Sequence, residues 1–202
     1  MRPRADRRAN AERGILLAVF AALALAACGD ENPFRSTSPQ VFEGENQVWE
    51  LGLPAFPSGW DFASAQRIFV GTDDIGGSTG AFLLDARTDG TLAFRPFSTF
   101  LAPGLSGVRT GIQDLGAVPY ESVEEVPEGG YSDVNDSAGV AVQQGHVYAF
   151  RITRSQGGIV PINYAKLGVI EVGTEFPGEP ASRFARFRWA YQVQPLNRRV
   201  VE

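Results

Sequence analysis

Hydrophobic and polar positions alternate along most of this chain. The clearest run is 184–193, where the apolar face holds Ala185, Phe187, Trp189, Tyr191 and Val193 and the polar face holds Arg186, Arg188 and Gln192. Residues 147–153 repeat the pattern, with Tyr148, Phe150 and Ile152 opposed to Ala149, Arg151 and Thr153. Residues 164–172 place Ala165, Leu167 and Val169 together. A period of two is the period of a β-strand with one buried face.

Turn signals separate further strands. Residues 81–87 and 91–97 are joined by Thr88-Asp89-Gly90, whose Asp-Gly pair favours a tight hairpin. Weaker strands are predicted at 47–53, 67–71 and 139–143. Beyond residue 28, no stretch of a dozen residues keeps a helical apolar spacing without Gly or Pro. We therefore predict one all-β domain at 41–202, an antiparallel β-sandwich or a partly closed barrel.

The first 27 residues have the pattern of a signal peptide. Five arginines and only two acidic residues precede an uncharged run at 14–27. As a helix this run would be about 21 Å long, short of the roughly 30 Å hydrocarbon core of a bilayer. We interpret 1–27 as a signal peptide for the general secretory route, removed from the mature protein.

The run ends in Leu25-Ala26-Ala27-Cys28, which resembles the lipobox of bacterial lipoproteins. The resemblance implies that Cys28 is acylated and becomes the first mature residue, with 28–40 as a flexible tether. Gly29, in place of the Asp that retains such proteins at the inner membrane, favours the outer membrane. The alternative is a chance Cys at the end of an Ala-rich helix, with secretory cleavage nearby.

Composition excludes several classes of function. The chain of 202 residues has a net charge of −5, which argues against nucleic acid because phosphate binding needs clustered Lys and Arg. It has one His and one Cys, too few for a zinc site built from several such ligands or for a thiol relay.

An acidic stretch interrupts the alternation. No basic residue occurs between Thr110 and Phe150, and the acidic residues and glycines there predict a long loop at 112–137. The simplest interpretation is a solvated loop that keeps the protein soluble. Its oxygen-bearing side chains at Asp133, Asn135 and Asp136 are also candidate calcium ligands, although their spacing departs from an EF-hand.

Residues 76–80 match the G-x-S-x-G pattern of a serine hydrolase nucleophile. Ser78, followed by Asp114 or Asp133 and then by His146, even reproduces a Ser–Asp–His chain order. The pattern requires a helix after the serine, whereas here a predicted strand follows it. A glycine-rich turn is the simpler interpretation, with His146 in a turn that faces solvent.

Four short motifs together suggest a family. Trp60-Asp61-Phe62-Ala63, Val147-Tyr148-Ala149-Phe150-Arg151, Tyr164-Ala165-Lys166-Leu167 and Phe187-Arg188-Trp189-Ala190-Tyr191-Gln192 occur in an order that resembles the HmuY-like lipoproteins. Lys166 is the single lysine of the chain. The resemblance implies an all-β, lipid-anchored protein of the cell envelope that captures haem, in company with an outer-membrane receptor.

The resemblance does not extend to the ligands. In well-known members two His or Met residues clamp the haem iron, but the mature chain has one His and no Met. Haem would need His146 or a tyrosine such as Tyr131. We therefore expect a non-enzymatic outer-membrane lipoprotein that binds a ligand not identified by the sequence. Haem binding in iron acquisition is the alternative, and a serine hydrolase using Ser78 is a weaker one.

Overall fold

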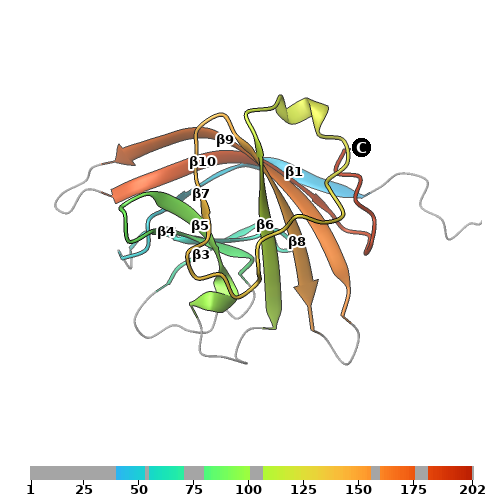
Figure 1. Ribbon diagram of the computed structural model, residues 1–202, viewed down its shortest axis with the longest axis horizontal. Coiled ribbons are helices and arrows are strands. Elements are labelled where there is room, and N and C mark those ends of the chain that lie inside the picture. The colour runs from blue at the N-terminus through green and yellow to red at the C-terminus, as the bar shows by residue number, and fades with distance from the viewer. Residues whose placement is uncertain are drawn as a thin grey trace, which may run out of the picture. The chain divides into compact units, whose positions relative to one another are not determined.

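The computed structural model describes residues 40–52, 55–70, 80–100, 107–155, 160–175 and 182–201. Two antiparallel five-stranded sheets make up this part of the chain (Figure 1). The larger sheet has, in spatial order, β1 (Val41–Trp49), β10 (Ser182–Gln192), β9 (Ile162–Glu175), β8 (Val147–Arg154) and β6 (Val108–Gly116). The smaller has β3 (Gln66–Ile68), β2 (Gly59–Asp61), β4 (Phe82–Ala86), β5 (Leu92–Pro96) and β7 (Val140–Ala141).

The described residues contain no α-helix, and their two short helical turns are of the 3₁₀ type, η1 (Phe97–Thr99) and η2 (Tyr120–Ser122). The two sheets do not close on each other, so the fold is a β-sandwich and the prediction of an all-β domain is confirmed. The predicted signal peptide at 1–27 and Cys28 lie outside the described residues, as does the predicted tether up to residue 39.

The main core lies between the sheets and is rich in aromatic rings. Along β10 every second side chain enters it, as the alternation predicted: Ala185, Phe187, Trp189 and Tyr191 are all buried there. The smaller sheet supplies Phe82 and Phe94, whose ring centroids are 4.9 Å apart in an edge-to-face pair. The predicted hairpin between β4 and β5 is present, with Gly90 at a φ of 82°.

The predicted elements differ from the structure at one strand, at one loop and at one strand that the sequence did not indicate. The first strand begins at Val41 and ends at Trp49, rather than spanning 47–53. The first half of this strand shows no alternation of apolar and polar residues, because its core-side positions are held by Gly44 and Asn46 rather than by apolar side chains. These two residues are the cross-strand neighbours of Trp189 and Phe187. The predicted loop at 112–137 is wrong at its start, because 112–116 belong to β6. The short β2 was not predicted.

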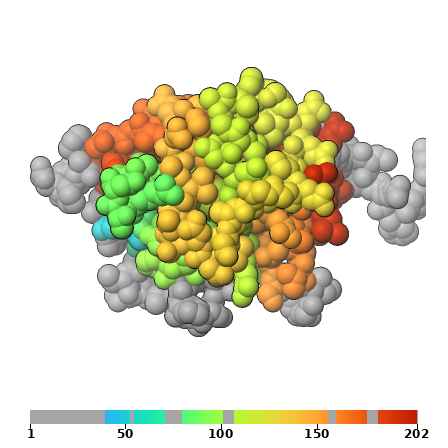
Figure 2. Space-filling view, viewed as in Figure 1, coloured from blue at the N-terminus to red at the C-terminus, as the bar shows by residue number. Residues whose placement is uncertain are grey.

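A second apolar cluster covers the outer face of the larger sheet. Ala149, Tyr164 and Ala190 of the sheet pack there against Val126 and Val200. Val126 comes from the segment 117–139, which we name the acidic flap, and this segment spreads over the face shown in Figure 2. The sheet thus buries apolar side chains on both faces, and the flap is packed against it.

Candidate functional site

The acidic flap is docked on the larger sheet through Tyr120. A Cβ atom at Gly168 of β9 would lie 2.8 Å from the Tyr120 ring, so the absence of a side chain at Gly168 makes room for the ring. Two cations flank it: Lys166 Nζ lies 4.2 Å and Arg188 Cζ 4.1 Å from the ring centroid. Cations over an aromatic face are attracted by its quadrupole. Burial raises the pKa of the Tyr120 phenol.

Lys166 fixes the backbone of the flap. Its side chain is buried, and Nζ donates hydrogen bonds to the carbonyl oxygens of Tyr120 (3.2 Å) and Val123 (2.8 Å). Burial lowers the pKa of this amine, because the charged form is separated from water. The single lysine of the chain therefore has a structural role, which joins β9 to the turn η2.

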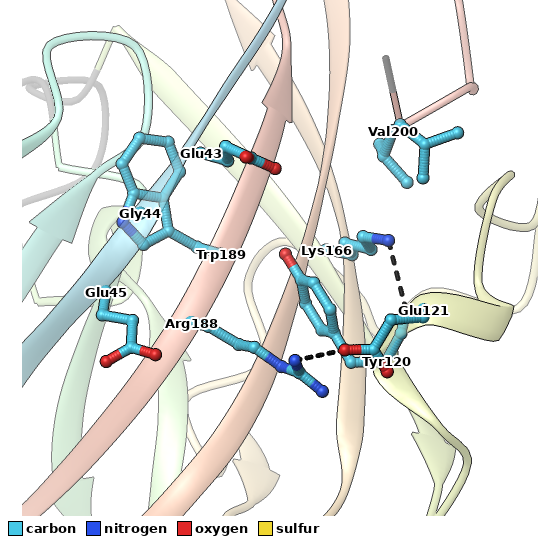
Figure 3. Close-up of a pocket in the computed structure, with 10 residues that line it drawn as sticks. Glu43, Gly44, Glu45, Tyr120, Glu121, Lys166, Arg188, Trp189 and Val200 are labelled. Carbon is cyan, nitrogen blue, oxygen red and sulfur yellow. Dashed lines mark hydrogen bonds and ion pairs between the residues drawn. The ribbon is translucent and has the colours of Figure 1, made fainter.

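Beside Tyr120 lies a pocket of about 530 Å³, lined by residues of β1, β9, β10 and the flap (Figure 3). Arg188 in this pocket donates a hydrogen bond from Nη1 to the Glu121 carboxylate. On β1, Glu45 is the cross-strand neighbour of Arg188 and Glu43 is that of Ala190, and both glutamates line this pocket (Figure 3). Neither of these two exposed carboxylates has a hydrogen bond or ion pair among the described residues.

A second pocket of about 380 Å³ shares Glu45, Tyr120 and Arg188 with the first. We name the two pockets together the Tyr120 groove. His146 lines its far end. The His146 side chain is 20% exposed, and its Nδ1 lies 3.0 Å from the Asp114 carboxylate, so it does not simply face solvent as expected. This contact orients the imidazole.

Tyr131, the other residue considered for haem, lies in a different pocket. Its hydroxyl donates a hydrogen bond to the carbonyl of Pro127 at 2.7 Å, and burial raises the pKa of the phenol. His146 and Tyr131 thus line separate pockets. Haem ligation by either residue alone stays a prediction, and the described geometry adds nothing in its favour.

The candidate calcium ligands are engaged in local turns. Asp133 Oδ1 accepts hydrogen bonds from Asn135 N (2.8 Å) and Asn135 Nδ2 (3.1 Å), and Asp136 Oδ1 accepts one from Ala138 N (2.9 Å). The described residues contain no group of three or more His, Cys, Asp or Glu side chains placed to hold a metal ion. Calcium binding at this loop stays a prediction without further support.

The serine hydrolase hypothesis depends on Ser78, which lies outside the described residues. The structure does bring Asp114 to His146, as a catalytic triad would require. The strand β4 begins two residues after Gly80, and Gly80 itself packs against the Phe97 ring. A nucleophile of this type stands between a strand and a helix, and here a strand follows.

No known protein family, curated protein or solved structure matches this chain. The HmuY-like resemblance therefore rests on its short motifs alone. Three of those motifs lie on β8, β9 and β10, which are neighbours in the larger sheet. Within the described ranges, no helix is long and apolar enough to cross a bilayer.

Several residues of the groove were not found from the sequence. Tyr120 belongs to an irregular segment, and nothing in its neighbourhood indicates that it docks on a glycine of a distant strand. Glu43 and Glu45 carried a usable signal, because a spacing of two places both side chains on one face of a strand. That signal was missed because the strand was predicted to begin at residue 47.

Proposed function

We propose that this protein is a lipid-anchored, non-enzymatic binding protein of the bacterial outer membrane. The signal peptide pattern and the lipobox at Leu25–Cys28 support export and acylation. In the sequence the predicted tether is followed by β1, which contributes Glu43 and Glu45 to the Tyr120 groove.

The observation that carries the binding role is the pair of carboxylates at Glu43 and Glu45. Two nearby acidic residues are paired: Glu121 of the flap with Arg188, and Glu171 of β9 with Arg186. Glu43 and Glu45 form no hydrogen bond or ion pair among the described residues, although they line a pocket with Lys166 and Arg188. Its three carboxylates, Glu43, Glu45 and Glu121, outnumber these two cations, and the excess of negative charge favours a ligand that brings positive charge.

The backbone of β1 supports an extended ligand. β1 is an edge strand, hydrogen-bonded only to β10 within its sheet, and residues 42–45 are exposed. An edge strand offers N–H and C=O groups to an added strand. Pairing between two copies of β1 about Gly44 would place Glu43 opposite Glu45, and like charges directly opposed are destabilising. We therefore infer that the partner is an extended, basic segment of another protein.

The binding test uses two blocked peptides, one alternating Lys and Val and the other alternating Glu and Val. The purified full-length mature protein is titrated with each in a calorimeter. We expect saturable binding of the basic peptide alone, weakened about tenfold or more in the E43Q/E45Q variant, since two charge pairs of about 1 kcal/mol each would be lost.

Glu128→Gln is the matched control, because it removes one exposed charge from the acidic flap away from the groove. Equal weakening by this variant, or binding of both peptides alike, would overturn the proposal. A haemin titration with a saturable Soret band would instead identify haem as the ligand.

The anchor is tested separately by fractionating cells that produce the wild type or Cys28→Ala. The wild type is expected in the outer membrane with acyl chains on Cys28, and the variant is expected outside that fraction. An unmodified Cys28 inside the exported chain would overturn lipid anchoring and leave the peptide test unaffected.

A further inference from the structure

The outer face of the larger sheet has a second recess, on the opposite side from β1. It is a pocket of about 350 Å³ between β6, β8 and the acidic flap, and we name it the arginine pocket. Two arginines, Arg109 and Arg151, line it together with glycines and uncharged side chains, and no acidic residue does.

The register of the sheet places the two arginines together. Arg109 of β6 faces Thr153 of β8, and Gly111 faces Arg151. Arg109 and Arg151 are therefore diagonal neighbours on one face of the sheet, about 7–8 Å apart at the backbone. Long side chains can meet over such a separation, so both guanidinium groups can contact one ligand.

Neither guanidinium is neutralised by the protein. Most arginines in the described part of the chain are paired with carboxylates: Arg95, Arg154, Arg183, Arg186, Arg188 and Arg198. The side chains of Arg109 and Arg151 have no hydrogen bond or ion pair among the described residues. Two such arginines in one pocket are notable in a protein whose net charge is −5.

The acidic flap contributes only uncharged residues to this pocket. Its backbone is held against β6 by two hydrogen bonds: Ser132 N donates to the Ile112 carbonyl (2.9 Å), and Ile112 N donates to Ser132 Oγ (3.1 Å). Gly111 permits this close approach, since a Cβ there would lie 2.9 Å from the Tyr131 Cβ. The carboxylate of Asp133 is turned to its own loop, where it accepts from Asn135.

We propose that the arginine pocket binds a phosphate group, carried by a small phosphorylated solute or by a lipid headgroup. Guanidinium groups hold tetrahedral oxyanions through paired N–H donors. The rest of the lining adds no charge: Thr153 Oγ1 already donates to the Arg109 carbonyl (3.1 Å), and Gly129 leaves open space beside the arginines. This inference is independent of the proposed function, which concerns the other side of the same sheet.

The test titrates the isotopically labelled, full-length mature protein with inorganic phosphate, using chloride to hold the ionic strength constant. NMR follows the amide signals of Gly111, Gly129 and Gly130. We expect saturable shifts at these amides, with affinity reduced about fivefold or more in R109Q and in R151Q, because each removes one charge-assisted contact. Arg→Lys variants at the same positions are expected to retain part of the affinity.

Arg67→Gln and Arg199→Gln are the matched controls, since both arginines are exposed, their side chains form no hydrogen bond or ion pair among the described residues, and they lie outside this pocket. They are expected to leave phosphate binding unchanged. Equal losses in all four variants would reduce the effect to general electrostatics and overturn the proposal, as would shifts that do not saturate.

Flotation with phosphatidylglycerol and phosphatidylcholine vesicles distinguishes the two sources of phosphate. This arm uses the Cys28→Ala variant, so that no acyl chain contributes to membrane binding. Binding to the anionic vesicles that R109Q weakens and phosphate displaces would assign the pocket to a lipid headgroup. Saturable phosphate binding without such flotation would assign it to a soluble phosphorylated compound.

Discussion

At the scale of single residues, Gly168 and Lys166 decide where the acidic flap docks. They are two apart on β9 and so share the outer face of the sheet. Gly168 leaves space for the Tyr120 ring, and Lys166 binds the backbone on either side of η2. Both interactions depend on the exact side chain at one position, so a substitution at either residue is expected to displace the flap from the sheet.

The first prediction concerns Gly168→Ala. The added methyl group would lie 2.8 Å from Tyr120, closer than atoms pack, so the ring must leave its place between Lys166 and Arg188. We expect a loss of roughly 1–3 kcal/mol in the free energy of unfolding, typical of overpacking. Gly44→Ala is the control, because its Cβ would make an ordinary 3.4 Å contact with Trp189. Similar losses in urea titrations of the two variants would contradict the docking role of Gly168.

At the scale of elements, the acidic flap behaves as a packed part of the fold. Val126 is 1% exposed and inserts into the outer apolar cluster, whereas Val118 in the same segment is 36% exposed. The flap thus combines a charged outer surface with an apolar inner one.

The second prediction compares alanine substitutions at these two valines. Val126→Ala is expected to lower the free energy of unfolding by roughly 1–2 kcal/mol and to speed protease cleavage within 117–139, because two buried methyl groups are lost. Val118→Ala should change neither quantity appreciably. If both variants were cleaved at the wild-type rate, the flap would not be held by this cluster.

The strands that the sequence predicted are those along which buried apolar and exposed polar side chains alternate, and the missed strands are those where this alternation is short or weak. β8, β9 and β10 alternate cleanly, and their predicted faces are the faces found. β6 places Thr110 and Ile112 on its core side and glycine at 111 on the other, which leaves too little contrast for a period of two. Lys166 was singled out as the single lysine, but its role depends on a loop more than forty residues away in the sequence.

At the scale of the whole molecule, the aromatic side chains link stability to pH. Burial raises the pKa of Tyr120, Tyr131, Tyr148 and Tyr191. In the unfolded chain these phenols ionise near pH 10. Above that pH the unfolded state therefore holds fewer protons than the folded state, and the free energy of unfolding falls as the pH rises. Lys166 has the opposite effect on the free energy of unfolding, because burial lowers its pKa. It is a single group, whereas four phenols act in the other direction.

The third prediction is that the protein loses stability as the pH rises from about 10 to 11, because the unfolded chain releases protons from these phenols that the folded state retains. Tyr120→Phe isolates one of them, since no hydrogen bond of its hydroxyl occurs among the described residues and the ring that stacks on Arg188 is retained. Guanidinium chloride titrations should show near-wild-type stability for this variant at pH 8 and a loss at pH 11 that is smaller by about 1 kcal/mol. Parallel curves for the wild type and the variant across this range would mean that the Tyr120 phenol is not protected from ionisation by the flap.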